Sequence, residues 1–211
     1  SAPGAHCGEI WEGAAMAKDT RAQILDGARL VFAQKGFHAS IKDIAAAAEI
    51  STTSLIFWHF KDKESLLLAV AQEASPLSQV QDVLAHNDIT GFESGPEEAI
   101  RAVVEKYFTV YSNPVNRAIL FQMLAATARH SEIRTLLQEQ LISVMNGQMA
   151  DIIRAGQHHR DFRLDLSPEF LGQTSLGLLF ALITRWHVEG VTRWSYEEVT
   201  RQLLTLLKPI P

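Results

Sequence analysis

The stretch from Ser40 to Leu67 constrains the fold of this 211-residue chain more than any other part of it. Its pattern predicts a short helix over 41–48, a turn over 49–51, and a second short helix that ends near Trp58. Ser40 is placed to cap the first of these helices, with Asp43 completing a capping box, and Ser51 or Thr52 is placed to cap the second. Helices this short are marginal in water, so neighbouring helices must brace them.

The rest of the chain supplies such neighbours. Apolar residues recur every three to four positions from Ile24 to Leu207, and no stretch alternates as a strand would, so we expect an all-α fold. Gly36 is expected to end the first helix in a left-handed conformation. The expected helices are 18–35, 41–48, 52–58, 63–86 with a kink near Pro76, 97–111, 115–129, 131–157, 168–188 and 196–209.

Charge and loop signals divide the chain into three parts. Residues 18–63 hold seven Lys and Arg against five Asp and Glu, whereas residues 64–211 hold 12 against 17. Residues 86–96 contain two Gly, one Pro and several cap-type residues, which indicates a loop. We therefore expect a flexible leader over 1–17, a small basic domain over 18–63 and a larger helical domain over 64–211, with Met16 as a candidate natural start.

Composition and motifs argue against several classes of protein. Cys7 is the only cysteine, the N-terminus lacks a secretory signal, and no apolar run is long enough to span a bilayer, so we expect a soluble cytoplasmic protein. No nucleophile elbow, phosphate loop, HExxH or CxxC is present, which argues against an enzyme and against a cofactor. His158 and His159 are adjacent on a helix and point about 100° apart, so we expect no metal site there.

Two short helices joined by a turn and braced by a first helix form a helix-turn-helix, although ordinary helical corners share this spacing. The residue pattern narrows the choice, because about 45 residues resemble the DNA-binding domain of TetR-family transcription regulators in order and spacing. The residues that carry the resemblance are Thr20, Arg21, Ile24, Leu25, Ala28, Phe32, Gly36, Phe37, Ile44, Ala45, Ala48, Ile50, Ser51, Phe57, Trp58, His59, Phe60, Lys61, Asp62, Lys63, Glu64 and Leu66.

The chain departs from the family pattern at three points. Glu49 stands where the family usually has Gly, so the turn either avoids a positive φ or accepts strain. One extra residue between Ile44 and Trp58 leaves the register of the recognition helix open by one residue. Phe57 replaces a common Tyr, which removes a phosphate contact and leaves packing as its expected role. These departures motivate an alternative: an all-α small-molecule-binding or interaction protein whose helix-turn-helix no longer binds specific DNA.

The resemblance implies a DNA-binding surface around the second short helix. Phosphate contacts are expected from the N-cap serine and the basic residues that flank the helices, and base contacts from hydroxyls and methyls, because no Arg or Lys lies between Thr52 and Trp58. The expected DNA-binding residues are Ser40, Lys42, Ser51, Thr52, Thr53, Ser54, Trp58, His59, Lys61 and Lys63. Phe60 is expected to pack in the core, while Trp58 suits either packing or a backbone contact.

The helix over 168–188 is apolar on two faces, which implies a partner beside its own core. By resemblance, this helix and the last one would form a four-helix homodimer interface, so that two reading heads meet a two-fold operator. A central helix of a monomeric bundle is the alternative. The expected interface residues are Gly172, Leu176, Leu179, Ile183, Trp186, Val199, Leu203 and Leu206.

By resemblance, the larger domain would also enclose a cavity for a small-molecule effector that releases the protein from DNA. Aromatic and Met side chains suit a mostly apolar ligand of uncertain shape, and no charged residue is placed inside, so we expect a neutral effector. The candidate lining residues are Tyr107, Phe108, Tyr111, Phe121, Gln122, Met123, Met145, Gln148 and Met149. Each of them also suits plain core packing.

Overall fold

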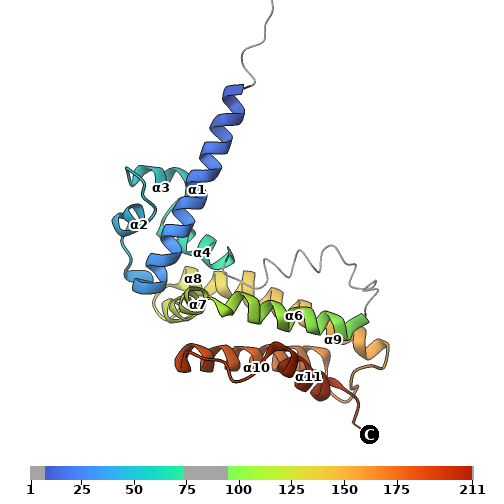
Figure 1. Ribbon diagram of the computed structural model, residues 1–211. Coiled ribbons are helices and arrows are strands. Elements are labelled where there is room, and N and C mark those ends of the chain that lie inside the picture. The colour runs from blue at the N-terminus through green and yellow to red at the C-terminus, as the bar shows by residue number, and fades with distance from the viewer. Residues whose placement is uncertain (1–7, 74–94, 211) are drawn as a thin grey trace, which may run out of the picture.

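The computed structural model describes residues 8–73 and 95–210, and within these ranges the chain is helical with no strand, which confirms the all-α prediction (Figure 1). The elements are α1 (Gly8–Lys35), η1 (Gly36–His38), α2 (Ile41–Ala47), α3 (Ser54–His59), α4 (Lys63–Glu73), α6 (Gly95–Ser112), α7 (Pro114–Ala126), α8 (Ser131–Leu136), η2 (Leu137–Ile142), α9 (Ser143–His158), α10 (Pro168–Glu189) and α11 (Tyr196–Leu207).

Helix α1 begins ten residues earlier than predicted, so the sequence expected to be the end of a flexible leader forms its first turns. Residues 8–17 are rich in Ala and Glu and contain Met16, all strong helix formers, and no proline separates them from Lys18. The end of the helix is where the sequence predicted it. Gly36 has a φ of 55°, the left-handed conformation expected of a residue that closes a helix.

Helix starts follow the predicted capping residues. The hydroxyl of Ser40 accepts a hydrogen bond from the backbone N–H of Asp43 at 3.1 Å, and the backbone N–H of Ser40 donates to the Asp43 carboxylate at 3.0 Å, which confirms the capping box. Asp62 caps α4 by accepting from the backbone N–H of Ser65 at 2.7 Å. Ser195 caps α11 in the same manner as Ser40 caps α2.

The turn between α2 and α3 is longer than predicted. Glu49 has a φ of 54°, so the turn accepts a left-handed residue where glycine would be relaxed. The prediction that Ser51 or Thr52 caps the next helix is wrong, because α3 starts at Ser54 with Thr53 as a cap residue that makes no side-chain capping bond. The Thr52 hydroxyl lies 2.5 Å from the Ser54 hydroxyl instead.

A first hydrophobic core contains residues of the four helices α1, α2, α3 and α4, and of α7, α8 and η2. Ile24 and Phe32 of α1, Ile44 of α2, Ile56 of α3 and Leu66 of α4 are all buried in it. In Figure 1, α2 and α3 lie beside α1, and α4 runs from them toward the lower helices. Ile119 and Met123 of α7 and Leu137 of η2 also belong to this core, which therefore crosses the boundary proposed at residue 63.

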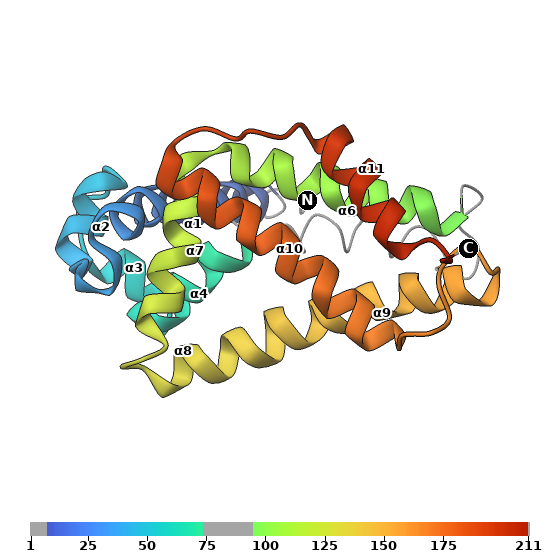
Figure 2. The same ribbon diagram turned by 90° about the horizontal axis from the view of Figure 1, so that it is seen from below.

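A second hydrophobic core fills the larger helical body, between α6, α9, α10 and α11. Its fully buried side chains include Ile100, Ile153, Leu179 and Leu207. Helices α10 and α11 lie on the side of this body away from α1, and both are in view when the molecule is seen from below (Figures 1 and 2).

Helix α4 accounts for residues 63–73 of the helix predicted over 63–86. The rest of that prediction, including the kink near Pro76, and most of the predicted 86–96 loop lie outside the described residues. The helix predicted over 131–157 runs as α8, η2 and α9 without a break, but η2 is π-helical. Single π turns inside α-helices are frequent at functional sites, and Leu137 of η2 faces the cavity described below.

Candidate DNA interface and effector cavity

Helix α3 is anchored by one buried face and presents the other to solvent. Ile56 is 1% exposed and Phe60, the residue that ends the helix, is 6% exposed, which confirms the predicted packing of Phe60. On the opposite face Leu55 is 37% exposed, Phe57 53% and Trp58 71%. Trp58 therefore does not pack in the core, and Phe57, for which packing was the only expected role, is open to a partner.

Polar residues surround this exposed face. Thr52, Ser54 and the adjacent Ser51 are exposed at the N-terminal end of α3, Thr53 is half-buried, and His59 is half-buried between the rings of Trp58 and Phe60. Hydroxyl groups and apolar side chains thus share the surface. The described part of α3 offers no guanidinium or ammonium group, so it cannot make the bidentate contact to guanine that Arg provides.

The predicted phosphate-binding residues occupy different situations. Lys42 and Lys61 are exposed. The ammonium of Lys63 donates to the backbone carbonyl of Ala39 at 3.3 Å, so this lysine also ties the start of α4 to the start of α2. The Ser40 hydroxyl donates to the Asp43 carboxylate at 2.8 Å, so the capping box and a phosphate would compete for Ser40.

The carboxyl group of Asp43 is held ionised by its neighbours. The ammonium of Lys35 lies 2.9 Å from it and is the largest cause, and the backbone N–H and hydroxyl of Ser40 add to the effect, so the pKa of Asp43 falls from 3.8 to about 2. The ion pair links the end of α1 to the start of α2. Because both side chains are partly exposed, the ion pair adds only modestly to the packing of these helices.

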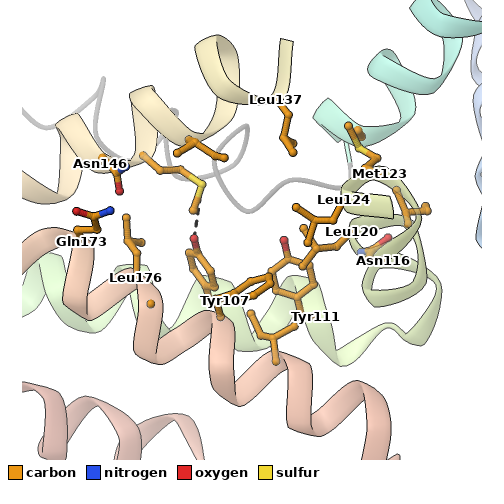
Figure 3. A pocket seen from close by; sticks show the side chains of 17 residues that line it. Tyr107, Tyr111, Asn116, Leu120, Met123, Leu124, Leu137, Asn146, Gln173 and Leu176 are labelled. Carbon is orange, nitrogen blue, oxygen red and sulfur yellow. Dashed lines mark hydrogen bonds between the residues drawn. The ribbon is translucent and has the colours of Figure 1, made fainter. Parts of the chain in front are cut away.

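A cavity of about 360 Å³ lies between the two hydrophobic cores (Figure 3). Its walls include members of the first core, among them Ala71 of α4 and Met123 of α7, and members of the second core, among them Tyr107 and Ile183. The full lining is Ala71, Tyr107, Tyr111, Asn116, Ile119, Leu120, Met123, Leu124, Leu137, Ile142, Met145, Asn146, Gln173, Leu176, Gly177, Phe180 and Ile183. None of these residues carries a charge at neutral pH.

Two tyrosines contribute hydroxyl groups to the cavity wall. Burial raises the pKa of both Tyr107 and Tyr111 above the usual value, so both hydroxyls stay protonated and can donate. The Tyr107 hydroxyl donates to the sulfur of Met145 at 3.7 Å, a weak acceptor. A carbonyl or hydroxyl oxygen of a ligand would replace that sulfur with a gain in hydrogen-bond strength.

Four of the nine predicted cavity residues line it: Tyr107, Tyr111, Met123 and Met145. The other five are used elsewhere. Phe108 packs on Trp186 with ring centres 5.8 Å apart, Phe121 stacks on His187 at 4.6 Å, Gln122 packs against Gly36, Gln148 is half-buried outside the lining, and Met149 belongs to the second core.

Sequence reasoning missed most of the cavity. On α7 the missed residues Asn116, Ile119, Leu120 and Leu124 follow helical spacing around Met123, so that stripe was available as a signal. Ala71 lies on the helix predicted over 63–86, which precedes the predicted 86–96 loop, whereas the predicted cavity residues all follow that loop. Nothing local in the sequence places it beside α7.

The residues predicted for the dimer interface mostly face their own subunit. Leu179, Ile183, Val199 and Leu203 are buried in the second core, and Ile183 also lines the cavity with Leu176. Trp186 covers the buried guanidinium of Arg117 at 4.7 Å, and Gly172 packs against the α9 backbone rather than a partner. Of the eight predicted residues only Leu206 is largely exposed. The predicted stripe of α10 thus faces the core of its own subunit.

The face of α10 that remains exposed is the opposite one. Phe170 is 57% exposed and Val188 78% exposed, and Thr174, Gly177 and Ala181 between them are exposed as well. Helix α10 itself lies on the side of the molecule away from α1 (Figures 1 and 2). Exposed apolar patches of this kind mark interaction surfaces.

No helix within residues 8–73 and 95–210 combines the length and the hydropathy that a bilayer crossing requires. No three His, Cys, Asp or Glu side chains in these ranges gather closely enough to hold a metal ion.

Comparison with known proteins shows similarity to bacterial transcription regulators in the DNA-reading end and over most of the chain. Residues 24–70 match the sequence model of the family described as bacterial regulatory proteins, tetR family. The chain is 24% identical to the fatty acid metabolism regulator protein of Bacillus subtilis over 168 residues, covering 78% of this chain and 81% of that one. It is 27% identical to the transcriptional regulator TtgR of Pseudomonas putida over 179 residues, covering 81% of each.

Solved structures show the same fold beyond the DNA-reading end. The regulator FadR of Bacillus subtilis, solved in complex with stearoyl-CoA, superposes with a TM-score of 0.71 at 22% identity, covering 88% of this chain and 96% of that one. FadR from Bacillus halodurans gives a TM-score of 0.72 at 21% identity with the same coverage. With the helix-turn-helix match and the helical body both accounted for, the chain belongs to the TetR family of DNA-binding transcriptional regulators.

Proposed function

We propose that the protein is a cytoplasmic, homodimeric repressor that binds a two-fold DNA operator and releases it when a small, mostly apolar effector enters the cavity. The observation that carries this proposal is the position of the cavity. Its wall contains Ala71 of α4 together with Tyr107, so a ligand there touches both the core that holds α3 and the core of the larger body.

Helix α4 provides the mechanical connection in this proposal. It starts four residues after α3 ends, and the ammonium of Lys63 at its first turn bonds to Ala39 at the start of α2. A ligand that displaces Ala71 would tilt α4 and carry α2 and α3 with it. In a dimer, a small tilt in each subunit changes the separation of the two recognition helices, which must match one turn of DNA.

The exposed face of α10 supports a dimer. Phe170, Ala181 and Val188 are open to solvent in a single copy, and two such faces packed about a two-fold axis would cover each other. This arrangement differs from the predicted interface in the residues it uses, but it retains the same two helices.

DNA binding is tested by fluorescence anisotropy with the chain's own upstream intergenic DNA and a scrambled duplex of the same composition. We expect the upstream duplex to bind at least tenfold more tightly at physiological salt. Equal affinity for both duplexes across salt concentrations would instead favour a protein whose helix-turn-helix has lost specific binding, an outcome that the lack of Lys and Arg on α3 makes worth testing.

A matched pair of variants tests the phosphate contacts. Lys61→Ala should weaken binding to both duplexes alike, because phosphate contacts are independent of sequence. It should also reduce the slope of log affinity against log salt concentration by about one. Lys208→Ala, which removes the same charge at the far end of the chain, should leave DNA binding unchanged. A change in base preference with Lys61→Ala would show that this lysine reads bases.

A further inference from the structure

A second hollow of about 290 Å³ adjoins the effector cavity and shares two residues with it. Asn146 of α9 and Gln173 of α10 belong to both linings, and their amide groups point toward one another at one end of the cavity (Figure 3). Beyond this amide pair the lining consists of Gly147, Ala150, Asp151, Arg154 and Glu169. The two hollows therefore meet at this amide pair, with the uncharged chamber on one side of it and a charged outer groove on the other.

The outer groove carries two carboxylates and one guanidinium. Arg154 pairs with Asp151 on its own helix and with Glu169 across the groove, where the nitrogen to oxygen distance is 2.6 Å. Hydrogen bonds from its own backbone N–H and from Arg154 lower the pKa of Glu169, so its carboxyl is ionised at neutral pH. The lining of the groove thus has a net charge of about −1, and its single cation is already engaged by two anions.

The inner chamber is uncharged and therefore suits a different part of a ligand. Apart from Tyr107 and Tyr111, its polar groups are amides, and the side-chain oxygen of Asn116 is buried with no hydrogen-bond partner among the described residues. The Asn116 amide nitrogen donates to the Val110 carbonyl at 2.9 Å, which fixes that oxygen in place. An uncharged, mainly apolar group with at most one or two hydrogen-bonding atoms suits this space.

Among the described residues that line the two hollows, the only cation that could meet a polyanionic head group is Arg154, which already pairs with two carboxylates. The sequence between Glu73 and Gly95 contains no Lys or Arg either. The relative solved with stearoyl-CoA holds a ligand with several phosphate charges, whereas the described lining of these two hollows offers one guanidinium.

We infer that the effector is a monocationic amphiphile, with its apolar body in the chamber and its ammonium group beyond the Asn146–Gln173 neck, against Asp151 and Glu169. This inference rests on the proposed function, since it names the ligand of the same cavity. The cation adds to the carboxylate pair already bridged by Arg154 and brings the net charge of the groove to zero. A carboxylate head in the same position would raise the net charge to about −2.

The test uses three ligands that share one alkyl chain and differ in head charge: decyltrimethylammonium, decanol and decanoate. Binding to the full-length protein is measured by isothermal titration calorimetry at pH 7 and low salt. We expect the cation to bind most tightly and the carboxylate most weakly, with about a fivefold step between neighbours, as is usual for partly exposed charges. The steps should shrink at high salt because the groove is open to solvent.

Charge variants of the groove make the test specific. Glu169→Gln should narrow the preference for the cation, and Asp151→Asn combined with Glu169→Gln should reverse it in favour of decanoate, because Arg154 then stands alone. Both carboxylates are at least half exposed, so the variants should fold, which circular dichroism checks. Glu132→Gln is the control, since it removes the same charge about five helical turns before Asp151.

Several outcomes would overturn the inference: decanoate binding as tightly as the cation to the unmodified protein, an order that the double variant leaves unchanged, or no binding of any of the three. Operator release is followed separately by anisotropy. If the ligands bind in the expected order but never release DNA, the ligand class stands and the proposed regulatory function fails. If DNA binding is specific but the three ligands bind in another order, the proposed regulatory function stands and the inferred ligand class fails.

Discussion

The side chain of Gln122, on α7, packs directly against Gly36, the left-handed residue that ends α1. A Cβ atom added at Gly36 would collide with the amide group of Gln122. Helix α7 also contributes Met123 and Leu124 to the cavity wall, so one helix touches both the effector site and the end of the helix that supports the DNA-reading domain. The contact between Gln122 and Gly36 is a second connection between the two regions, beside α4.

The substitution Gly36→Ala tests this contact. It forces a side chain into a φ of 55° and against Gln122, so we expect a loss of about 1–2 kcal/mol from the backbone conformation alone, plus the cost of the collision. The free energy of unfolding is measured in urea. Adding Gln122→Ala should recover only the collision part. A double variant no more stable than Gly36→Ala would show that the two residues are not coupled.

The contact of Asp43 with Lys35, together with the capping box, predicts a pH dependence for the DNA-reading domain. The pKa of Asp43 is about 2 in the folded protein and 3.8 when the carboxyl has no partners, as in the unfolded chain. The ionised carboxylate therefore stabilises the folded state above pH 4, and this stabilisation is lost as the pH falls toward 2. Asp43→Asn should therefore be less stable than the unmodified protein at pH 5, with the gap closing at pH 2.5. Urea midpoints at the two pH values measure it, and a gap that is independent of pH would contradict the assignment.

Helix α3 predicts how bases are read. Its exposed surface combines Leu55, Phe57 and Trp58 with hydroxyl groups, and the apolar group that the major groove offers is the thymine methyl. After selection of the preferred operator from random duplexes, replacing thymine by deoxyuridine in the half-sites should weaken binding about fourfold for each contacted methyl, in line with the value of one buried methyl group. Deoxyuridine placed outside the half-sites is the control. Unchanged affinity in the half-sites would exclude reading through methyl groups.

The exposed face of α10 predicts which substitutions separate folding from dimerisation. Ala181→Glu adds a charge to this face and should give a folded monomer in analytical ultracentrifugation. Leu179→Asp, two residues earlier, buries a charge in the second core and should instead cost about 3 kcal/mol or more of stability. Thr109→Glu, on an exposed position of α6, serves as the control. A dimeric Ala181→Glu protein would place the interface elsewhere.

The local sequence determined much of the N-terminal half. The capping box at Ser40, the left-handed Gly36 and the buried residues of α1 could be predicted because each depends on residues within one or two helical turns. The family resemblance also lies there, over a stretch in which order and spacing are short-range. The start of α3 was the exception, since several hydroxyl residues in a row can cap a helix and only the observed turn selects Ser54 as its first residue.

The tertiary structure decided what the larger body does with its apolar residues. A helix apolar on two faces, such as α10, gives no local sign of which face meets its own core, and only packing against α9 placed Leu179 inside and Ala181 outside. The cavity depends in the same way on side chains that come together from α4, α6, α7, η2, α9 and α10. Helical periodicity is a property of one segment, whereas a cavity and a charged groove exist only where segments distant in the chain fail to fill the space between them.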